Sequence, residues 1–154
     1  MIAALDDPSL RVAGLAAIAL ANHGHENSVD PALAFLARNN DKDVVARHSG
    51  IMVLAKCAKP HTLAELKNNQ SPAIRRAATV ALRRQGAAEI AAFFDDPDTA
   101  VRQEAIRGAY DENIRGAFAA LSKRAHQIAK RVTPTVKYHP LSARRSLYAA
   151  WTLA

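Results

Sequence analysis

The chain has few of the residues on which many folds and sites depend. Cys57 is its single cysteine, so no internal disulfide can form. Aromatic residues make up 5% of the 154 residues, fewer than β-sheets usually contain. No apolar run approaches the roughly 18–20 residues of a membrane-spanning helix. The N-terminal residues lack the basic start and apolar centre of a signal peptide. We therefore expect neither a disulfide framework, nor a membrane span, nor a signal peptide in this sequence.

Acidic residues are missing from the last quarter of the chain. Residues 113–154 contain 8 Lys/Arg and no Asp or Glu, whereas residues 1–112 contain 13 Lys/Arg against 14 Asp/Glu. The net charge of +7 therefore belongs to the C-terminal quarter, and we expect electrostatic attraction to a partner to be local to it.

Patterns typical of catalysis are also missing. The sequence has no glycine-rich phosphate loop, and no base stands at a fixed spacing from Cys57, which we expect to be a small buried hydrophobe. The carboxylate pairs Asp6–Asp7 and Asp95–Asp96 precede prolines, which favours helix capping over acid–base chemistry. We predict that the protein is not an enzyme.

Two histidines lie close together in "NHGHEN", at positions 23 and 25, with Glu26 beside them. A metal site needs a third or fourth ligand at a suitable spacing, and none follows here. The pattern favours a polar turn between helices. We predict no metal ion and no cofactor bound to this chain.

An internal repeat is the strongest positive signal. "DPSLRVAGLAAIALANHG" (7–24) and "SPAIRRAATVALRRQG" (71–86) share a helix-starting residue and a proline, then an aliphatic residue, an arginine, and an alanine-rich run that ends in glycine. Further copies have their aliphatic or alanine residue at positions 46, 101 and 143. Successive copies are 36, 28, 27 and 42 residues apart. Such distances are typical of repeats built from two helices.

Each copy has the periodicity of an amphipathic helix. Apolar residues fall at positions zero, +4, +7 and +8, and the +4 residue is small in four copies, which lets neighbouring helices approach closely. We predict that Asp7, Ser71 and Asp96 cap these helices, each followed by a proline at the first helical position. The glycines at 24 and 86 are predicted helix ends.

The segments between the copies carry helical stripes of their own, at 31–40, 61–69, 87–96 and 114–125. Neither helix of a pair can bury its apolar stripe alone, and stacked pairs form one continuous core. The predicted fold is therefore all-α: a right-handed α-solenoid of about four to five helix pairs that fills residues 1–154 as a single domain.

The arginine that follows position zero has a structural interpretation. Asp7–Arg11, Asp43–Arg47 and Asp98–Arg102 are each four residues apart, a spacing that stabilises a helix by roughly 0.2–0.5 kcal/mol per pair. The arginines of this position, which include Arg75, can also reach an aspartate of a neighbouring repeat and form a ladder. Both interpretations assign structural roles to these residues.

The repeats resemble the HEAT-like family. "ARHSGIMVLA", the stretch 74–121 with its "DDPD" and "YDENI", and "PLSARRSLYAAWTLA" are similar to the HEAT segment of large PVC-type haem-binding proteins of planctomycetes and their relatives. The resemblance implies an exported or periplasmic bacterial protein. In it, a sugar-dehydrogenase β-propeller precedes the HEAT array and a c-type cytochrome domain follows.

The sequence departs from that architecture in its redox parts. "CAKPH" (57–61) puts three residues between cysteine and histidine, whereas a haem attachment site is C-x-x-C-H, so haem binding does not carry over. The short first helix and the apolar last residues resemble the interior of an array, since solenoids need polar caps. We expect a fragment of a larger chain.

The candidate partner-binding residues lie on the predicted inner face of the repeats and in a basic segment, 122–140, which we predict to be a linker-like insertion in the last pair. They are Arg76, Arg83, Arg84, Gln103, Arg107, Lys123, Arg124, Lys130, Arg131 and Lys137. The function predicted from these features is a non-enzymatic scaffold that docks or spaces neighbouring protein domains. One alternative is a HEAT module that binds nucleic acid through its basic C-terminal quarter. Another is a HEAT protein similar to bilin lyases.

Overall fold

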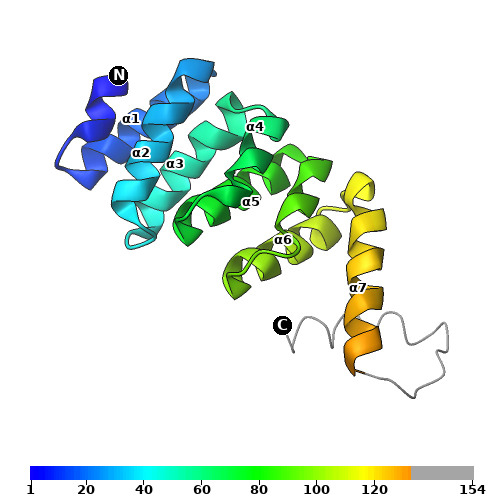
Figure 1. The fold of residues 1–154 in the computed structure, drawn as a ribbon. Helices are drawn as coiled ribbons and strands as arrows, with labels where there is room; N and C mark the ends of the chain where they lie inside the picture. The colour runs from blue at the N-terminus through cyan, green and yellow to red at the C-terminus, as the bar shows by residue number, and fades with distance from the viewer. Residues whose placement is uncertain (133–154) are drawn as a thin grey trace.

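The computed structural model describes residues 1–132, which are helical and contain no strand (Figure 1). This confirms the prediction of an all-α fold. The α-helices are α1 (Leu10–His23), α2 (Val29–Asn39), α3 (Val44–Cys57), α4 (Pro60–Glu65), α5 (Pro72–Gln85), α6 (Thr99–Asp111) and α7 (Phe118–Val132). The 3-10 helices are η1 (Ile2–Asp6), η2 (Glu26–Ser28), η3 (Leu66–Asn68), η4 (Ala88–Phe93) and η5 (Arg115–Ala117).

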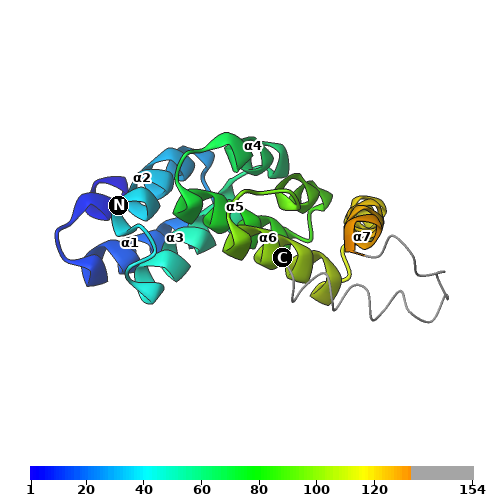
Figure 2. The same ribbon diagram turned by 60° about the horizontal axis from the view of Figure 1, so that its bottom comes forward.

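The helices that precede α7 form two layers, and α7 stands at the end of the row (Figures 1 and 2). In one layer α1, α3, α5 and α6 lie side by side, each in contact with the next. In the other layer η1, α2, α4 and η4 cover one face of this row. The core lies between the layers, and its largest fully buried side chains are Leu5, Phe35, Leu54, Leu63, Leu82, Ile90, Phe93 and Phe94.

Small residues allow the helices to pack closely, as the +4 positions predict. Gly50 of α3 faces Leu36 of α2, and a Cβ at Gly50 would lie 2.6 Å from Leu36 Cγ. Gly14 of α1 faces Ser49 of α3, where a Cβ would lie 3.4 Å from the Ser49 hydroxyl oxygen. An alanine at position 50 would therefore force the Leu36 side chain out of its present place.

The capping prediction was wrong for Asp7 and Asp96. Asp7 Oδ1 accepts a hydrogen bond from the Ser9 amide at 2.8 Å, and Ser9 is the N-cap of α1. Asp96 Oδ1 accepts from the Asp98 amide at 2.8 Å, and Asp98 is the N-cap of α6. In both places the aspartate closes an Asx turn around the proline, so the helix begins two residues later than a direct cap would place it.

Other helix ends agree better with the sequence. Pro72 is the first residue of α5, as predicted, although its N-cap Ser71 makes no side-chain capping bond. Asp43 caps α3 by accepting from the Ala46 amide at 2.7 Å. Gly24 and Gly86 end α1 and α5 in the left-handed conformation, which glycine adopts without strain.

Two predicted segments differ from their expected form. In place of a regular α-helix, η4 is a six-residue 3-10 helix at 88–93. α7 continues to Val132, so residues 122–132 of the predicted linker-like insertion are helical. Its remaining residues, 133–140, and the last repeat copy at 143–154 lie outside the described residues.

Two of the three ion pairs predicted within helices, Asp7–Arg11 and Asp43–Arg47, do not form in residues 1–132. Asp43 uses its carboxylate as a cap, and Arg47 Nη1 instead contacts Asp41 Oδ1 at 3.6 Å. Within residues 1–132, no ion pair joins Asp7 to Arg11. Arg102 Nη1 donates to the Asp96 carbonyl oxygen at 2.6 Å.

One contact has the form of the predicted ladder, because Arg75 of α5 reaches Asp96, which precedes α6. Arg75 Nε and Nη2 donate to the two carboxylate oxygens of Asp96 at 2.8 and 3.0 Å. Arg75 Nη1 also donates to the carbonyl oxygen of Asn69 at 2.8 Å. The bond to Asp96 raises the pKa of Arg75 above its ordinary value. Both residues are almost fully buried, so this bidentate pair fixes the start of α6 on α5.

Replacing Asp96 with alanine should strongly destabilise the protein, because it leaves the Arg75 charge buried without its carboxylate. We expect the free energy of unfolding to fall by about 3–5 kcal/mol. The matched control is Asp111→Ala, which removes an exposed pair with Arg107 (3.0 Å) and should cost no more than about 1 kcal/mol. Urea unfolding followed by circular dichroism measures both, and equal losses would contradict the role of the buried pair.

Candidate docking groove

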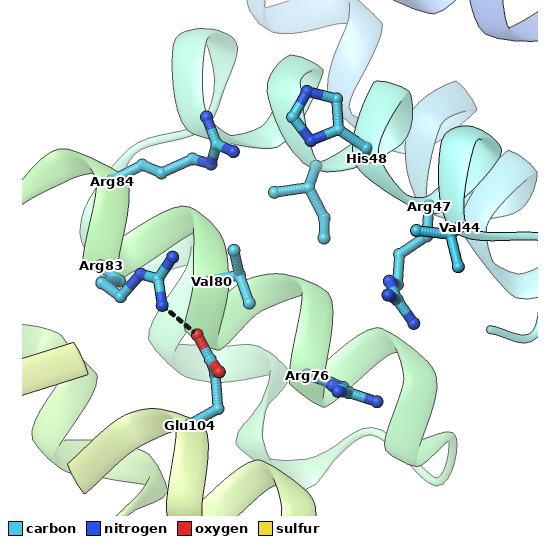
Figure 3. A pocket seen from close by; sticks show the side chains of 9 residues that line it. Val44, Arg47, His48, Arg76, Val80, Arg83, Arg84 and Glu104 are labelled. Atoms are coloured by element: carbon cyan, nitrogen blue, oxygen red, sulfur yellow. Dashed lines mark hydrogen bonds and ion pairs between the residues drawn. The ribbon is translucent and has the colours of Figure 1, made fainter. Parts of the chain in front are cut away.

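A hollow of about 230 Å³ lies between α3 and α5, and Figure 3 shows the side chains that line it. Gly50 faces α2, so His48, two residues earlier on the same helix, points to the opposite side. We call this hollow the arginine groove. It is lined by Val44, Arg47, His48 and Ile51 of α3, by Arg76, Val80, Arg83 and Arg84 of α5, and by Glu104 of α6.

The groove is apolar in its middle. In this middle Ile51 is buried and Val80 is half-buried, whereas Val44, at the edge beside Arg47 in Figure 3, has 63% of its surface exposed. Helical spacing explains the arrangement, because residues four apart share one face: Val80 lies between Arg76 and Arg84 on α5, and Ile51 follows Arg47 on α3. The result is a hydrocarbon surface with guanidinium groups along both sides.

At one end of the groove, Asp41 lies between two arginines. Arg47 Nη1 is 3.6 Å from Asp41 Oδ1, and Arg76 Nη1 is 3.4 Å from Asp41 Oδ2. Asp41 belongs to the loop between α2 and α3, where it and Asn40 have positive φ values of 60° and 45°. Asn and Asp tolerate this conformation better than other non-glycine residues, which explains the "NND" of the loop.

At the other end, Arg83 and Arg84 have different partners. Arg83 Nη1 donates to Glu104 Oε1 at 2.6 Å, as the dashed line in Figure 3 marks. Arg84 Nη1 contacts the sulfur of Met52 at 3.2 Å, and a thioether is a weak acceptor. Among residues 1–132, no carboxylate pairs with Arg84.

The groove therefore has an excess of positive charge. Four arginines line it, while Glu104 and the adjacent Asp41 supply two carboxylates, which leaves a formal charge of about +2 (four minus two). Guanidinium groups bind carboxylates and phosphates in a bidentate manner. The arrangement can hold an anionic group beside an apolar one.

The structure brings three of the predicted partner-binding residues together and places the others elsewhere or outside the described residues. Arg76, Arg83 and Arg84 meet in the groove. Gln103 and Arg107 lie on α6, outside the groove lining, and Arg107 pairs with Asp111. The residues Lys123, Arg124, Lys130 and Arg131 lie on α7, where Arg124 is bonded to Asp95, and Lys137 lies outside the described residues.

Sequence reasoning missed His48 and Glu104, and assigned Arg47 a structural role only. A signal for His48 exists in the repeat itself. The residue two places after position zero is His48 in one copy and Arg76 in the next, and both line the groove. Glu104 has no such signal, because its place in the groove depends on the packing of α6 against α5.

Cys57 is buried, as predicted. Its sulfur lies 3.9 Å from the carbonyl oxygen of Leu20, and burial raises the pKa of its thiol. Residues 1–132 contain no group of three or more His, Cys, Asp or Glu side chains that is placed to hold a metal ion. No helix within this range has the length and apolarity to cross a bilayer.

Alkylation of Cys57 should be slow in the folded protein. Burial keeps the group as a thiol, and the reactive species is the thiolate, so we expect iodoacetamide at pH 8 to react more than about tenfold slower than in urea-unfolded protein. Intact-mass spectrometry over time measures the rate. Equal rates in the two states would contradict the burial of this residue.

Comparisons with protein-family models, with curated proteins and with solved structures found no match to this chain. The resemblance to HEAT-like repeats therefore stays a prediction from the sequence.

Proposed function

We propose that the chain is a right-handed, HEAT-like α-solenoid that acts as a docking and spacing module and not as a catalyst. The observation that carries this proposal is the arginine groove, which two adjacent helices of one row build on the face that the second layer leaves uncovered. The alternation of helices between two layers supports the solenoid, since each pair buries its stripe against its neighbours.

The rigidity of the row supports a docking role. Gly14 of α1 meets Ser49 of α3 within the row, and the buried Arg75–Asp96 pair links α5 to the start of α6. The groove side chains thus stand at fixed spacing on elements that cannot easily shift. A partner that matches this pattern binds side chains that are already ordered, which lowers the entropic cost of association.

The chemistry of the groove favours binding over catalysis. Guanidinium groups stay protonated at neutral pH, so the four arginines serve neither as general bases nor as nucleophiles. Glu104, the one carboxylate in the lining, is bonded to Arg83. Within the PVC-type architecture that the sequence resembles, such a module holds flanking redox domains apart, and this part of the proposal rests on the resemblance.

Charge reversal in the groove should abolish partner binding. The measurement is quantitative affinity capture from the source cells with the unchanged chain and with the double variant Arg76→Glu, Arg84→Glu. We expect the double variant not to bind most of the proteins that the unchanged chain captures. The matched control reverses two exposed basic residues outside the groove, Lys67→Glu and Arg115→Glu, and should retain them. Circular dichroism checks that both variants are folded. Retention of the same proteins by both variants would contradict docking at the groove.

A further inference from the structure

We propose that the arginine groove binds an acidic polypeptide segment in which an aliphatic side chain lies between carboxylates, and that Asp41 competes with this segment for Arg47 and Arg76. This inference rests on the proposed docking function. It specifies the chemistry of the partner segment, and it identifies Asp41 as a residue of this chain that lowers the affinity for that segment.

The shape and lining of the groove indicate a side chain as the occupant. Its volume of about 230 Å³ is smaller than the roughly 300–1,000 Å³ of a typical small-molecule pocket. Ile51, Val80 and Val44 provide a hydrocarbon surface that a leucine- or valine-like side chain covers favourably. A purely ionic ligand makes no use of this surface.

The position of the charges fixes what must flank that side chain. Basic groups stand on both sides of the apolar middle, with Arg47 and Arg76 near Asp41 and with His48 and Arg84 opposite (Figure 3). Arg84 has only the Met52 sulfur as partner within the described part of the chain. A carboxylate of the partner forms a stronger, charge-assisted bond to Arg84 than the thioether does.

Asp41 binds its arginines more weakly than Glu104, the other carboxylate of the groove, does. Its contacts with Arg76 and Arg47 measure 3.4 and 3.6 Å, longer than the roughly 2.7–2.9 Å of a good charge-assisted hydrogen bond. The Arg83–Glu104 bond measures 2.6 Å. A partner carboxylate therefore replaces Asp41 more easily than Glu104, and Asp41 reduces affinity until it is displaced.

The same features favour polypeptide over nucleic acid. Duplex DNA carries one negative charge per roughly 1.7 Å of its axis, so a phosphate backbone along the groove brings charges close to Asp41 and Glu104. Discrete carboxylates of a peptide can be spaced to avoid these residues. A backbone of phosphates also leaves the aliphatic middle of the groove uncovered.

The first test compares labelled probes by fluorescence anisotropy with the full chain. The probes are a short peptide of alternating glutamates and leucines, the same peptide with glutamine for glutamate, the same peptide with serine for leucine, and a DNA duplex. We expect the first peptide to bind best, and each replacement to weaken binding by about tenfold or more, since charge-assisted bonds and aliphatic burial each contribute on the order of that factor. Equal binding of the glutamine peptide, or tighter binding of the duplex, would overturn the proposal.

The second test uses variants of the chain. Arg84→Gln should weaken binding of the glutamate–leucine peptide by about tenfold, as expected for a lost charged bond. Arg115→Gln, outside the groove, should leave the affinity for this peptide unchanged. Asp41→Asn should tighten binding, by about threefold to tenfold, because it frees two arginines of a competing charge. Asparagine tolerates the positive φ of position 41, so the loop keeps its conformation. Weaker or unchanged binding of Asp41→Asn would disprove the competition.

The results separate this inference from the docking function. If affinity capture depends on Arg76 and Arg84 but the glutamate–leucine peptide does not compete with the captured proteins, docking stands and the acidic chemistry is wrong. If the capture does not depend on these arginines, the docking function itself is wrong, and the inference falls with it.

Discussion

The structure depends on close contact between helices whose facing residues are small. Gly14 of α1 meets Ser49 of α3, and Gly50 of α3 leaves no room for even one more carbon beside Leu36 of α2. The large apolar residues fill the space between the two layers. The uncovered face of the row is then free to carry basic and aliphatic side chains at the spacing of adjacent helices.

The arginines of the chain show how burial separates structural from functional roles. Arg75 and Arg76 are neighbours in the sequence, yet Arg75 is buried in a bidentate pair with Asp96 and Arg76 lies in the groove beside Asp41. The two side chains leave α5 in different directions, because consecutive residues on a helix point about 100° apart. A scaffold built in this way can vary its exposed arginine without losing the buried one.

Much of the fold could be predicted from the sequence, because periodicity and glycine stops report local geometry directly. α1, α2, α3 and α5 lie where their stripes predicted them. The Asx turns of Asp7 and Asp96 could not be predicted, since the same Asp-Pro sequence permits a direct cap or an Asx turn. Of the groove, Arg76, Arg83 and Arg84 were predicted from their helix face. The role of Asp41 was not, because it depends on the conformation of the loop between α2 and α3 and on the packing of α3 against α5.

The most direct test of the central claim is nuclear magnetic resonance detection of the arginine Nε–Hε groups during titration with the glutamate–leucine peptide. We expect the signals of Arg47, Arg76 and Arg84 to shift together and saturably, whereas that of Arg75, buried against Asp96, stays in place. Shifts confined to arginines outside the groove, or no shift at saturating peptide, would contradict the central claim.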